Sequence, residues 1–208
     1  MELKQVINTI FKAMKQRYGY RRVHMQPWKQ GWKVDHKLVY KFMDQMRLKS
    51  QVRARKKYNS HKSQISHIAN NVLDRNFTPD KPNMVWVSDV TEFRVAGTKV
   101  YLSPIMELHD CSILAHELST SPSTKFTSTS SNNAMTWHSP GEGLIVHTDQ
   151  GLQYQYSSWR KLIDSVGCIQ SMSCKGNCYN NAVMENFFGH LKAEMYHGEH
   201  FTSVEDFR

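Results

Sequence analysis

Three acidic residues in this sequence are placed where carboxylates can do chemistry: Asp89, Asp149 and Glu185. Asp89 lies in the middle of an apolar run predicted to be a buried strand, where a charge is costly unless a cation or hydrogen-bond donors satisfy it. Asp149 closes another predicted strand, and α/β folds place their ligands at the carboxyl ends of strands. Glu185 lies one turn into a predicted helix. Taken singly, each has a structural explanation, because acidic residues are common at strand ends and helix starts.

Taken together, the three carboxylates are oxygen donors from separate elements, a set that suits hard cations such as Mg²⁺. Without a cation they would repel one another, and the pKa of at least one would rise. Two Mg²⁺ ions bridging such a cluster can activate an attacking water or 3′-hydroxyl and stabilise the leaving oxygen of a phosphodiester. We therefore predict a site for two Mg²⁺ ions, for which Mn²⁺ can substitute.

The elements that must position these carboxylates are read from β-propensity and hydrophobic periodicity. From residue 84 onward the chain changes to short runs rich in β-forming residues, and helical patterns follow later. The expected order is strands 85–93, 99–108 and 112–118, strand 144–147, helix 157–166, strand 168–172 and helix 181–195. Strands in series followed by alternating helices and strands predict an α/β fold, a mixed sheet flanked by helices.

The segment 119–140 fits this pattern poorly. A crossover helix is expected here, yet the segment is crowded with serine and threonine. Both are weak helix formers, so we expect a loop or a frayed helix.

Before the predicted sheet lies a small basic all-α region. Apolar residues at helical spacing predict helices over 2–16 and 36–47, and Asp35 is a suitable N-cap for the second. The basic, aromatic connection contains a turn that begins at Tyr18 and is followed by two adjacent cations, Arg21 and Arg22. This arrangement is typical of a helix-turn-helix, which can place one helix in the DNA major groove. The alternative is a small helical bundle with a solvated basic face.

Charge is distributed unevenly along the chain. Residues 1–62 carry 17 Lys and Arg against three Asp and Glu, a net charge of +14, whereas residues 63–208 carry −5. A basic arm joined to a mildly acidic domain indicates that the arm meets a polyanion. We expect a DNA-binding region over 1–50, a basic linker over 51–82 that follows the phosphate backbone, and a catalytic core over 83–208.

Composition excludes several other classes of protein. No run approaches the roughly 18 apolar residues of a membrane span, and the first 15 residues lack a secretory apolar segment. We therefore expect a cytoplasmic protein with no membrane partner. The four cysteines form no C-x-x-C pair, so free thiols are expected in place of a zinc site or a disulfide framework.

Four motifs make the chain resemble a known family. They are Trp86–Thr91, His147–Gly151, Gln170–Ser173 and Glu185–Lys192, and 35 residues separate Asp149 from Glu185. Their order and spacing resemble the retroviral-integrase-type catalytic core, and most closely the second-frame transposase of the insertion-sequence-three family. Residues 18–23 and 34–39 also resemble the helix-turn-helix of that family, so the similarity covers nearly the whole chain.

The resemblance implies a ribonuclease H-like fold in which Asp89, Asp149 and Glu185 bind the Mg²⁺ ions. It further implies a transposase that nicks the ends of a mobile element and joins the freed 3′-hydroxyl to a target, with no covalent protein–DNA intermediate. The expected partners are double-stranded DNA, both element ends and target, and further copies of the chain in a homo-oligomer on DNA. The expected location is the bacterial cytoplasm, at the nucleoid.

Residues near the carboxylates are assigned smaller roles. His147 and Gln150 are expected beside the site, and His147 is equally explained as a structural histidine. Tyr154 and Tyr156 are either residues that stack on DNA bases or ordinary residues of the core or the surface. Lys192, two turns after Glu185, is either a phosphate contact or a solvated lysine. The predicted DNA contacts are Arg21, Arg22, Lys56, Lys57, Lys175, Asn177 and Lys192.

The chain departs from the family pattern at several points. Asn180 stands where Asp is usual, Cys174 replaces a basic residue, and the sequence stops at Arg208, early in an expected helical tail. A truncated, inactive DNA-binding remnant that inhibits transposition is therefore the alternative to an active transposase. A cellular ribonuclease H-like nuclease is a third reading, and a preference for RNA–DNA hybrids would distinguish it.

Overall fold

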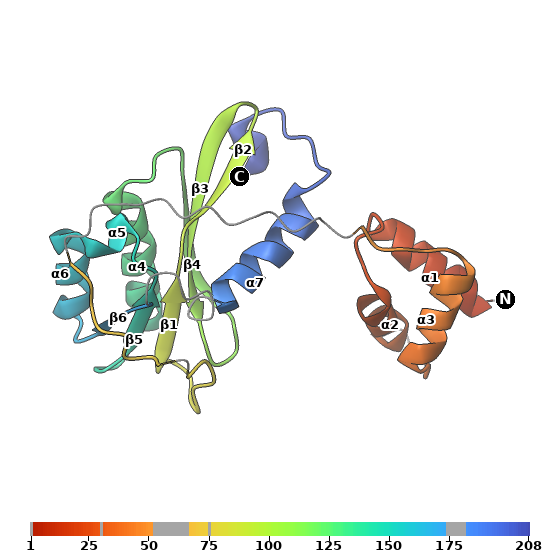
Figure 1. Ribbon diagram of the computed structural model, residues 1–208, viewed down its shortest axis with the longest axis horizontal. Helices are drawn as coiled ribbons and strands as arrows, with labels where there is room; N and C mark the ends of the chain where they lie inside the picture. Colours follow the sequence, from red (N-terminus) through yellow and green to blue (C-terminus); the bar gives the residue numbers. More distant parts are fainter. Residues whose placement is uncertain (1, 30, 52–66, 75, 174–181) are drawn as a thin grey trace. The chain divides into compact units, whose positions relative to one another are not determined.

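The computed structural model describes residues 2–29, 31–51, 67–74, 76–173 and 182–208. The chain divides into two compact units, Met1–Asn59 and Ser60–Arg208 (Figure 1). None of the helices within the described residues is long and apolar enough to cross a lipid bilayer.

The N-terminal unit contains three helices, α1 (Glu2–Ala13), α2 (Tyr20–Lys29) and α3 (His36–Gln45). They share a core whose buried members are Ile7, Ile10, Phe11, Val23, Val39 and Met43. Asp35 caps α3 as predicted, because its Oδ1 accepts the Lys37 N–H at 2.7 Å.

The helix α2 was missed: it begins at Tyr20, so the two cations predicted to follow a turn in the connection lie in its first turn. Among the described side chains of α2, Val23 and Pro27 are buried and most of the others are polar, so the segment carries only a short version of the stripe that marks an amphipathic helix. Pro27 lies inside the helix and cannot donate a backbone hydrogen bond there. The first helix is also shorter than 2–16, because Lys15 and Gln16 adopt left-handed backbone angles.

The second unit is built on a mixed six-stranded sheet. Its strands are β1 (Val85–Ser88), β2 (Thr91–Val95), β3 (Thr98–Glu107), β4 (Ile113–Ser119), β5 (Ile145–Thr148) and β6 (Ile169–Met172). β1 and β2 both pair antiparallel with one edge of β3, and β4 pairs antiparallel with β3 as well. β5 pairs parallel with β1, and β6 pairs parallel with β5. The predicted mixed sheet is therefore confirmed.

The single strand predicted over 85–93 is in fact two strands, and Asp89 lies at the break between them. β1 and β2 keep one register against β3, and continuing it places Asp89 opposite Pro104. Pro104 has no N–H to donate to a neighbouring strand. Asp89 Oδ1 instead accepts the N–H of Val90 at 2.7 Å. Asp89 is thus a strand-end residue, not a mid-strand one.

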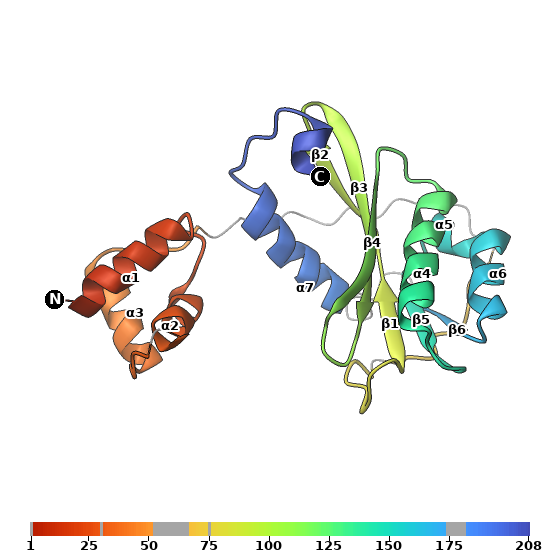
Figure 2. The same cartoon turned by 180° about the vertical axis from the view of Figure 1, so that it is seen from behind.

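Helices cover both faces of the sheet (Figures 1 and 2). One face packs against α4 (Thr124–His138), α5 (Leu152–Gln155) and α6 (Ser157–Ser165), in a cluster that includes Trp86, Tyr154 and Trp159. The opposite face packs against α7 (Ala182–Leu191), the π-helical segment Lys192–Tyr196 and α8 (Val204–Phe207), in a cluster that includes Val87 and Met184.

The serine- and threonine-rich segment forms a regular crossover helix, α4, and not a loop. Two of its fully buried hydroxyls are hydrogen-bonded to backbone carbonyls: Ser130 Oγ donates to Ser103 O of β3 at 2.7 Å, and Ser131 Oγ donates to Thr127 O at 3.0 Å. Ser131 Oγ also accepts the Trp159 indole N–H at 3.3 Å. Hydroxyls bonded to backbone carbonyls can lie in a core, so a polar helix takes the place of an apolar one.

Candidate active site

The carboxyl ends of β1 and β5 bring two of the three predicted carboxylates together. The two strands run parallel, with Ser88 opposite Thr148 as their last pair. Asp89 and Asp149 each follow by one residue, so they leave neighbouring strands at equivalent positions. Neighbouring strands lie about 4.8 Å apart. The sheet itself therefore juxtaposes these two acidic side chains at one edge.

Asp149 is held by the turn that follows it. Its Oδ1 accepts the Gly151 N–H at 2.9 Å. Burial raises the pKa of Asp149, and the hydrogen bond from Gly151 opposes that rise. A Cβ added at Gly151 would clash with Gln153 Nε2 and lie 2.8 Å from Asp149 Oδ1, so the side chains of Gln153 and Asp149 would both have to shift. The turn thus brings a backbone donor close to a half-buried carboxylate.

Tyr154 lies below the aspartate pair. Its ring is fully buried, and its hydroxyl forms a hydrogen bond of 3.1 Å with Ser88 Oγ. Burial, together with the negative charges of Asp89 and Asp149, raises the pKa of Tyr154 well above 10.0. Tyr154 is therefore a protonated core residue and not a stacking platform, while Tyr156 is exposed.

Glu185 lies in the first turn of α7 and is exposed. Its neighbour Met184 packs in the same cluster as Val87 of β1, which sets α7 against the sheet face that carries Val87. Strand alternation assigns Asp89 to that same face. Within the described ranges, no three His, Cys, Asp or Glu side chains lie close enough to hold a metal ion. The structure therefore does not join Glu185 to the two aspartates, and its role stays a prediction.

Comparison with known proteins identifies the family. The chain is 36% identical over 207 residues to the putative transposase InsK of insertion sequence element IS150 from Escherichia coli K12, covering 100% of this chain and 73% of that protein. It is 40% identical over 173 residues to a transposase-like protein of Haemophilus influenzae, covering 83% of this chain and 79% of that protein. It is also 29% identical to the transposase InsF of insertion sequence IS3A, over 98% of this chain and 70% of the relative. The chain belongs to the insertion-sequence-three transposase family.

Family models support the same assignment, and a solved structure shares the fold of this chain. Models of the integrase core domain match residues 79–178 and 185–208, and an HTH-like domain matches residues 1–57. The cryo-EM structure of the simian T-cell lymphotropic virus intasome with PP2A regulatory subunit B56 gamma contains a chain of similar fold, with a TM-score of 0.51. It is 17% identical, over 86% of this chain and 56% of that one. The ribonuclease H-like fold and the helix-turn-helix prediction are confirmed.

His147 lies on β5, two residues before Asp149. It is buried, and its Nδ1 forms a hydrogen bond of 2.9 Å with Ser171 Oγ on the adjacent strand β6. Gln150 lies nearer the carboxylates, in the turn after Asp149. Its Nε2 donates to Ser173 O at 2.9 Å, while its buried Oε1 has no hydrogen-bond partner among the described residues.

The predicted DNA contacts are distributed over both units. Arg21 and Arg22 lie in the first turn of α2, and the Arg22 guanidinium lies 5.3 Å from the centre of the Tyr18 ring. Lys192 begins the π-helical segment after α7 and does not continue its α-helix, and its Nζ lies 5.1 Å from the centre of the Phe93 ring. The remaining predicted contacts, Lys56, Lys57, Lys175 and Asn177, lie outside the described residues, as do Cys174 and Asn180.

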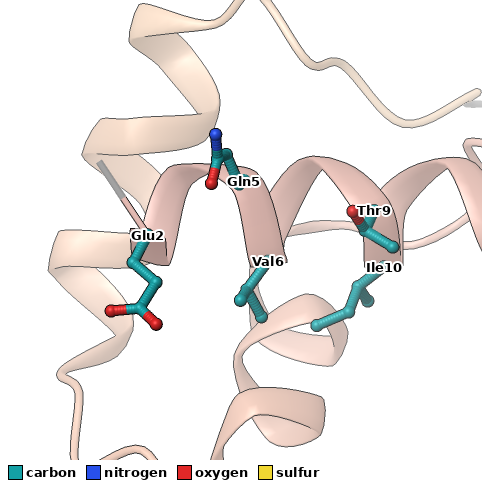
Figure 3. Close-up of a pocket in the computed structure, with 5 residues that line it drawn as sticks. All are labelled: Glu2, Gln5, Val6, Thr9 and Ile10. Carbon is teal, nitrogen blue, oxygen red and sulfur yellow. The ribbon is translucent and has the colours of Figure 1, made fainter.

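Two further features lie away from the carboxylates. A pocket of about 240 Å³ lies along α1, lined by Glu2, Gln5, Val6, Thr9 and Ile10 (Figure 3). It offers one ionisable side chain, so it does not mark a catalytic centre. Cys111 and Cys168 are free thiols, as predicted, and Cys178 lies outside the described residues.

Sequence reasoning missed the polar residues that surround the Asp149 turn. Gln155 and Ser171 are 3% and 0% exposed, and both bond to residues close to Asp149 in the chain. Ser171 could have been found from the sequence, because a serine inside a buried strand requires hydrogen-bond partners. Gln155 carried no comparable signal, since its helix was not predicted.

Proposed function

We propose that this chain is the DNA-cutting and DNA-joining transposase of an insertion sequence. In this proposal Asp89, Asp149 and Glu185 bind two Mg²⁺ ions, for which Mn²⁺ substitutes. The observation that carries it is the parallel register of β1 and β5, which sets two acidic side chains side by side at the ends of neighbouring strands. Two carboxylates so placed repel one another unless a cation lies between them.

The donor set fits a hard divalent cation. Both strand-end groups are carboxylates, and oxygen ligands are those that Mg²⁺ prefers. His147, the nearest imidazole in the sequence, is directed to Ser171. The unpartnered Gln150 Oε1 adds a further oxygen in the same turn. Bound cations at such a site offset the carboxylate charges, activate an attacking oxygen and stabilise the leaving oxygen of a phosphodiester.

The residues of the chain fix the geometry that this chemistry needs. Asp89 is oriented by the Val90 N–H and Asp149 by the Gly151 N–H. Tyr154 stays protonated beneath them and holds the end of β1 through Ser88. Preorganised donors of this kind keep a catalytic carboxylate from reorienting as charge develops in the transition state.

Glu185 supplies the third carboxylate in this proposal. α7 is anchored to the sheet by Met184 and Phe188, which are buried in the cluster that contains Val87. A residue in the first turn of that helix is therefore tethered on the face of the sheet to which alternation assigns Asp89.

DNA is the proposed substrate of both units. The helix-turn-helix unit carries Arg21 and Arg22 in α2 for phosphate contacts, and Lys192 is proposed to contact phosphate in the core unit. Lys56, Lys57, Lys175 and Asn177 are proposed to contribute as well. Because two element ends must be brought together, a homo-oligomer on nucleoid DNA is part of the proposal, and sedimentation of the DNA complex measures it.

The experiment is Mn²⁺- or Mg²⁺-dependent nicking of a labelled duplex that carries the element's own end. We expect wild type to nick and Asp89→Asn, Asp149→Asn and Glu185→Gln to be inactive. Asp164→Asn, an exposed acidic position in α6, serves as the matched control and should retain activity. Folded wild type that binds the duplex without nicking it would identify a DNA-binding remnant instead. Preferential cleavage of RNA–DNA hybrids would identify a cellular nuclease.

A further inference from the structure

A chain of aligned amide groups ends on the carboxylate of Asp149. The His67 N–H donates to Gln155 Oε1 at 3.3 Å, and Gln155 Nε2 donates to Gln150 O at 2.7 Å. The Gly151 N–H then donates to Asp149 Oδ1 at 2.9 Å. Gln150 O can only accept and the His67 N–H can only donate, so the orientation of the Gln155 amide follows from its partners.

The middle link of this chain is a single rigid group. Gln150 O and the Gly151 N–H belong to one peptide bond, and that bond is planar. A side chain that fixes the carbonyl oxygen therefore also fixes the direction of the N–H. Gln155 is 3% exposed, so no water replaces it as the donor to Gln150 O without rearrangement. Each amide in such a row polarises the next, which strengthens the final bond to the carboxylate.

The first link belongs to the segment 67–73, which enters the core unit beside β6 (Figure 1). Val72 N and Leu73 N both donate to Ser171 Oγ, at 2.9 and 3.3 Å. Met172 N of β6 donates to Asn70 O at 3.4 Å. Leu73 is also buried in the core, so both hydrogen bonds and apolar packing hold the segment against the core unit.

We propose that Gln155 is a positioning residue that orients the Gln150–Gly151 peptide toward Asp149 and ties that orientation to the segment 67–73. The aspartate is then held for cation binding when this segment is seated against β6. The segment is part of the predicted linker 51–82, so the proposal couples the placement of this part of the linker against β6 to the orientation of the Asp149 carboxylate. This inference rests on the proposed function, because it assumes that Asp149 binds the cation.

The test is a Mn²⁺ titration of the full chain, read by electron paramagnetic resonance of free Mn²⁺ and by Tm. Gln155→Met keeps the length of the side chain and loses both hydrogen bonds. Partners of a metal-binding residue typically change metal affinity by about tenfold or more when removed. We expect that loss of affinity in Gln155→Met. Gln170→Met is the matched control, since it loses one glutamine-to-carbonyl bond, to Tyr154 O, and leaves the bonds of Gln155 to His67 and Gln150 in place.

A second pair of variants tests the link to the segment without changing Gln155. His67→Pro removes the backbone N–H, whereas His67→Ala retains it. We expect weaker Mn²⁺ binding in His67→Pro than in His67→Ala. In nicking assays, the Mn²⁺ concentration giving half-maximal rate should rise in Gln155→Met, while kcat at saturating Mn²⁺ stays near wild type.

The outcomes separate this inference from the proposed function. Wild type that binds no Mn²⁺, or binds it as Asp149→Asn does, contradicts the proposed function. Wild-type binding that depends on Asp149 but is unchanged in Gln155→Met overturns the positioning role. Equal affinities in folded His67→Pro and His67→Ala overturn the link to the segment 67–73. Equal weakening of Mn²⁺ binding in Gln155→Met and Gln170→Met would show that the loss of affinity reflects general destabilisation. That result would also overturn the positioning role of Gln155.

Discussion

Asp149→Asn perturbs the carboxylate pair with the least change in shape. Asparagine retains an oxygen that accepts the Gly151 N–H, but it removes the negative charge. Burial raises the pKa of Asp149 above its ordinary value of 3.8. The folded, metal-free protein therefore holds this proton more tightly than the unfolded chain does. The carboxyl group contributes stability that is present below pH 3.8 and is lost as the pH rises through the raised pKa.

Two measurable differences follow for Asp149→Asn. In EDTA, the Tm of wild type minus that of the variant should fall as the pH rises through the raised pKa. In saturating Mn²⁺ at neutral pH, wild type should be stabilised and the variant should not. A cation at 100 times its Kd adds about 2.7 kcal/mol, which for a chain of this length corresponds to about 5–10 °C in Tm.

The assay is thermal unfolding followed by circular dichroism, in EDTA and in Mn²⁺, across a pH series. Asp164→Asn is the control, because it removes a charge from an exposed position of α6 and should behave as wild type. An equal Mn²⁺-dependent rise in Tm for wild type and Asp149→Asn would refute the reasoning, since the cation would then bind elsewhere. If the pH dependence of Tm in EDTA were the same in Asp149→Asn as in wild type, the assignment of the raised pKa to Asp149 would be refuted.

Three other substitutions test neighbouring contacts. Gly151→Ala places a Cβ 2.8 Å from Asp149 Oδ1, so Mn²⁺ affinity should fall by roughly tenfold or more. The control is Gly141→Ala, where the added Cβ meets nothing within 4 Å, and its Mn²⁺ titration should match that of wild type. Tyr154→Phe leaves a buried serine hydroxyl at the end of β1 without its partner, and urea unfolding should show a loss of about 1–3 kcal/mol. Arg22→Gln should reduce the slope of log affinity against log salt by about 0.9 for one lost phosphate contact; an unchanged slope for duplex binding would exclude that contact.

The location of the aspartates was predictable from local sequence, but their adjacency was not. Asp149 is visible in the sequence as a polar residue that ends an apolar run, and Asp89 as an acidic residue within one, although the break between β1 and β2 at Asp89 was not predicted. That the two runs are neighbours depends on a crossover of more than 50 residues through α4, whose serine-rich sequence weakens every local helix signal. The resemblance to the integrase core supplied the pairing that propensity left open.

The missed features share one physical cause, which is that their stabilising partners are distant in sequence. The bond between the His67 N–H and Gln155 spans 88 residues, and those from Val72 and Leu73 to Ser171 span 99 and 98. Helix α2 is similar, because it depends on packing of Val23 against α1 and α3 more than on its own apolar stripe. Local patterns record propensity, whereas these contacts form only after the chain has folded.

The two aspartates and Glu185 of the proposed site are positioned by different kinds of structure. Asp89 and Asp149 extend from paired strands, so backbone hydrogen bonds along β1 and β5 fix their separation. Glu185 is carried by a helix whose position depends on side-chain packing of Met184 and Phe188. Packing of a helix tolerates small shifts more readily than strand register does, since a register shift moves every residue to the opposite face. In the proposed site the geometry of the aspartate pair is therefore set by the sheet itself, whereas the position of Glu185 depends on how α7 packs against it.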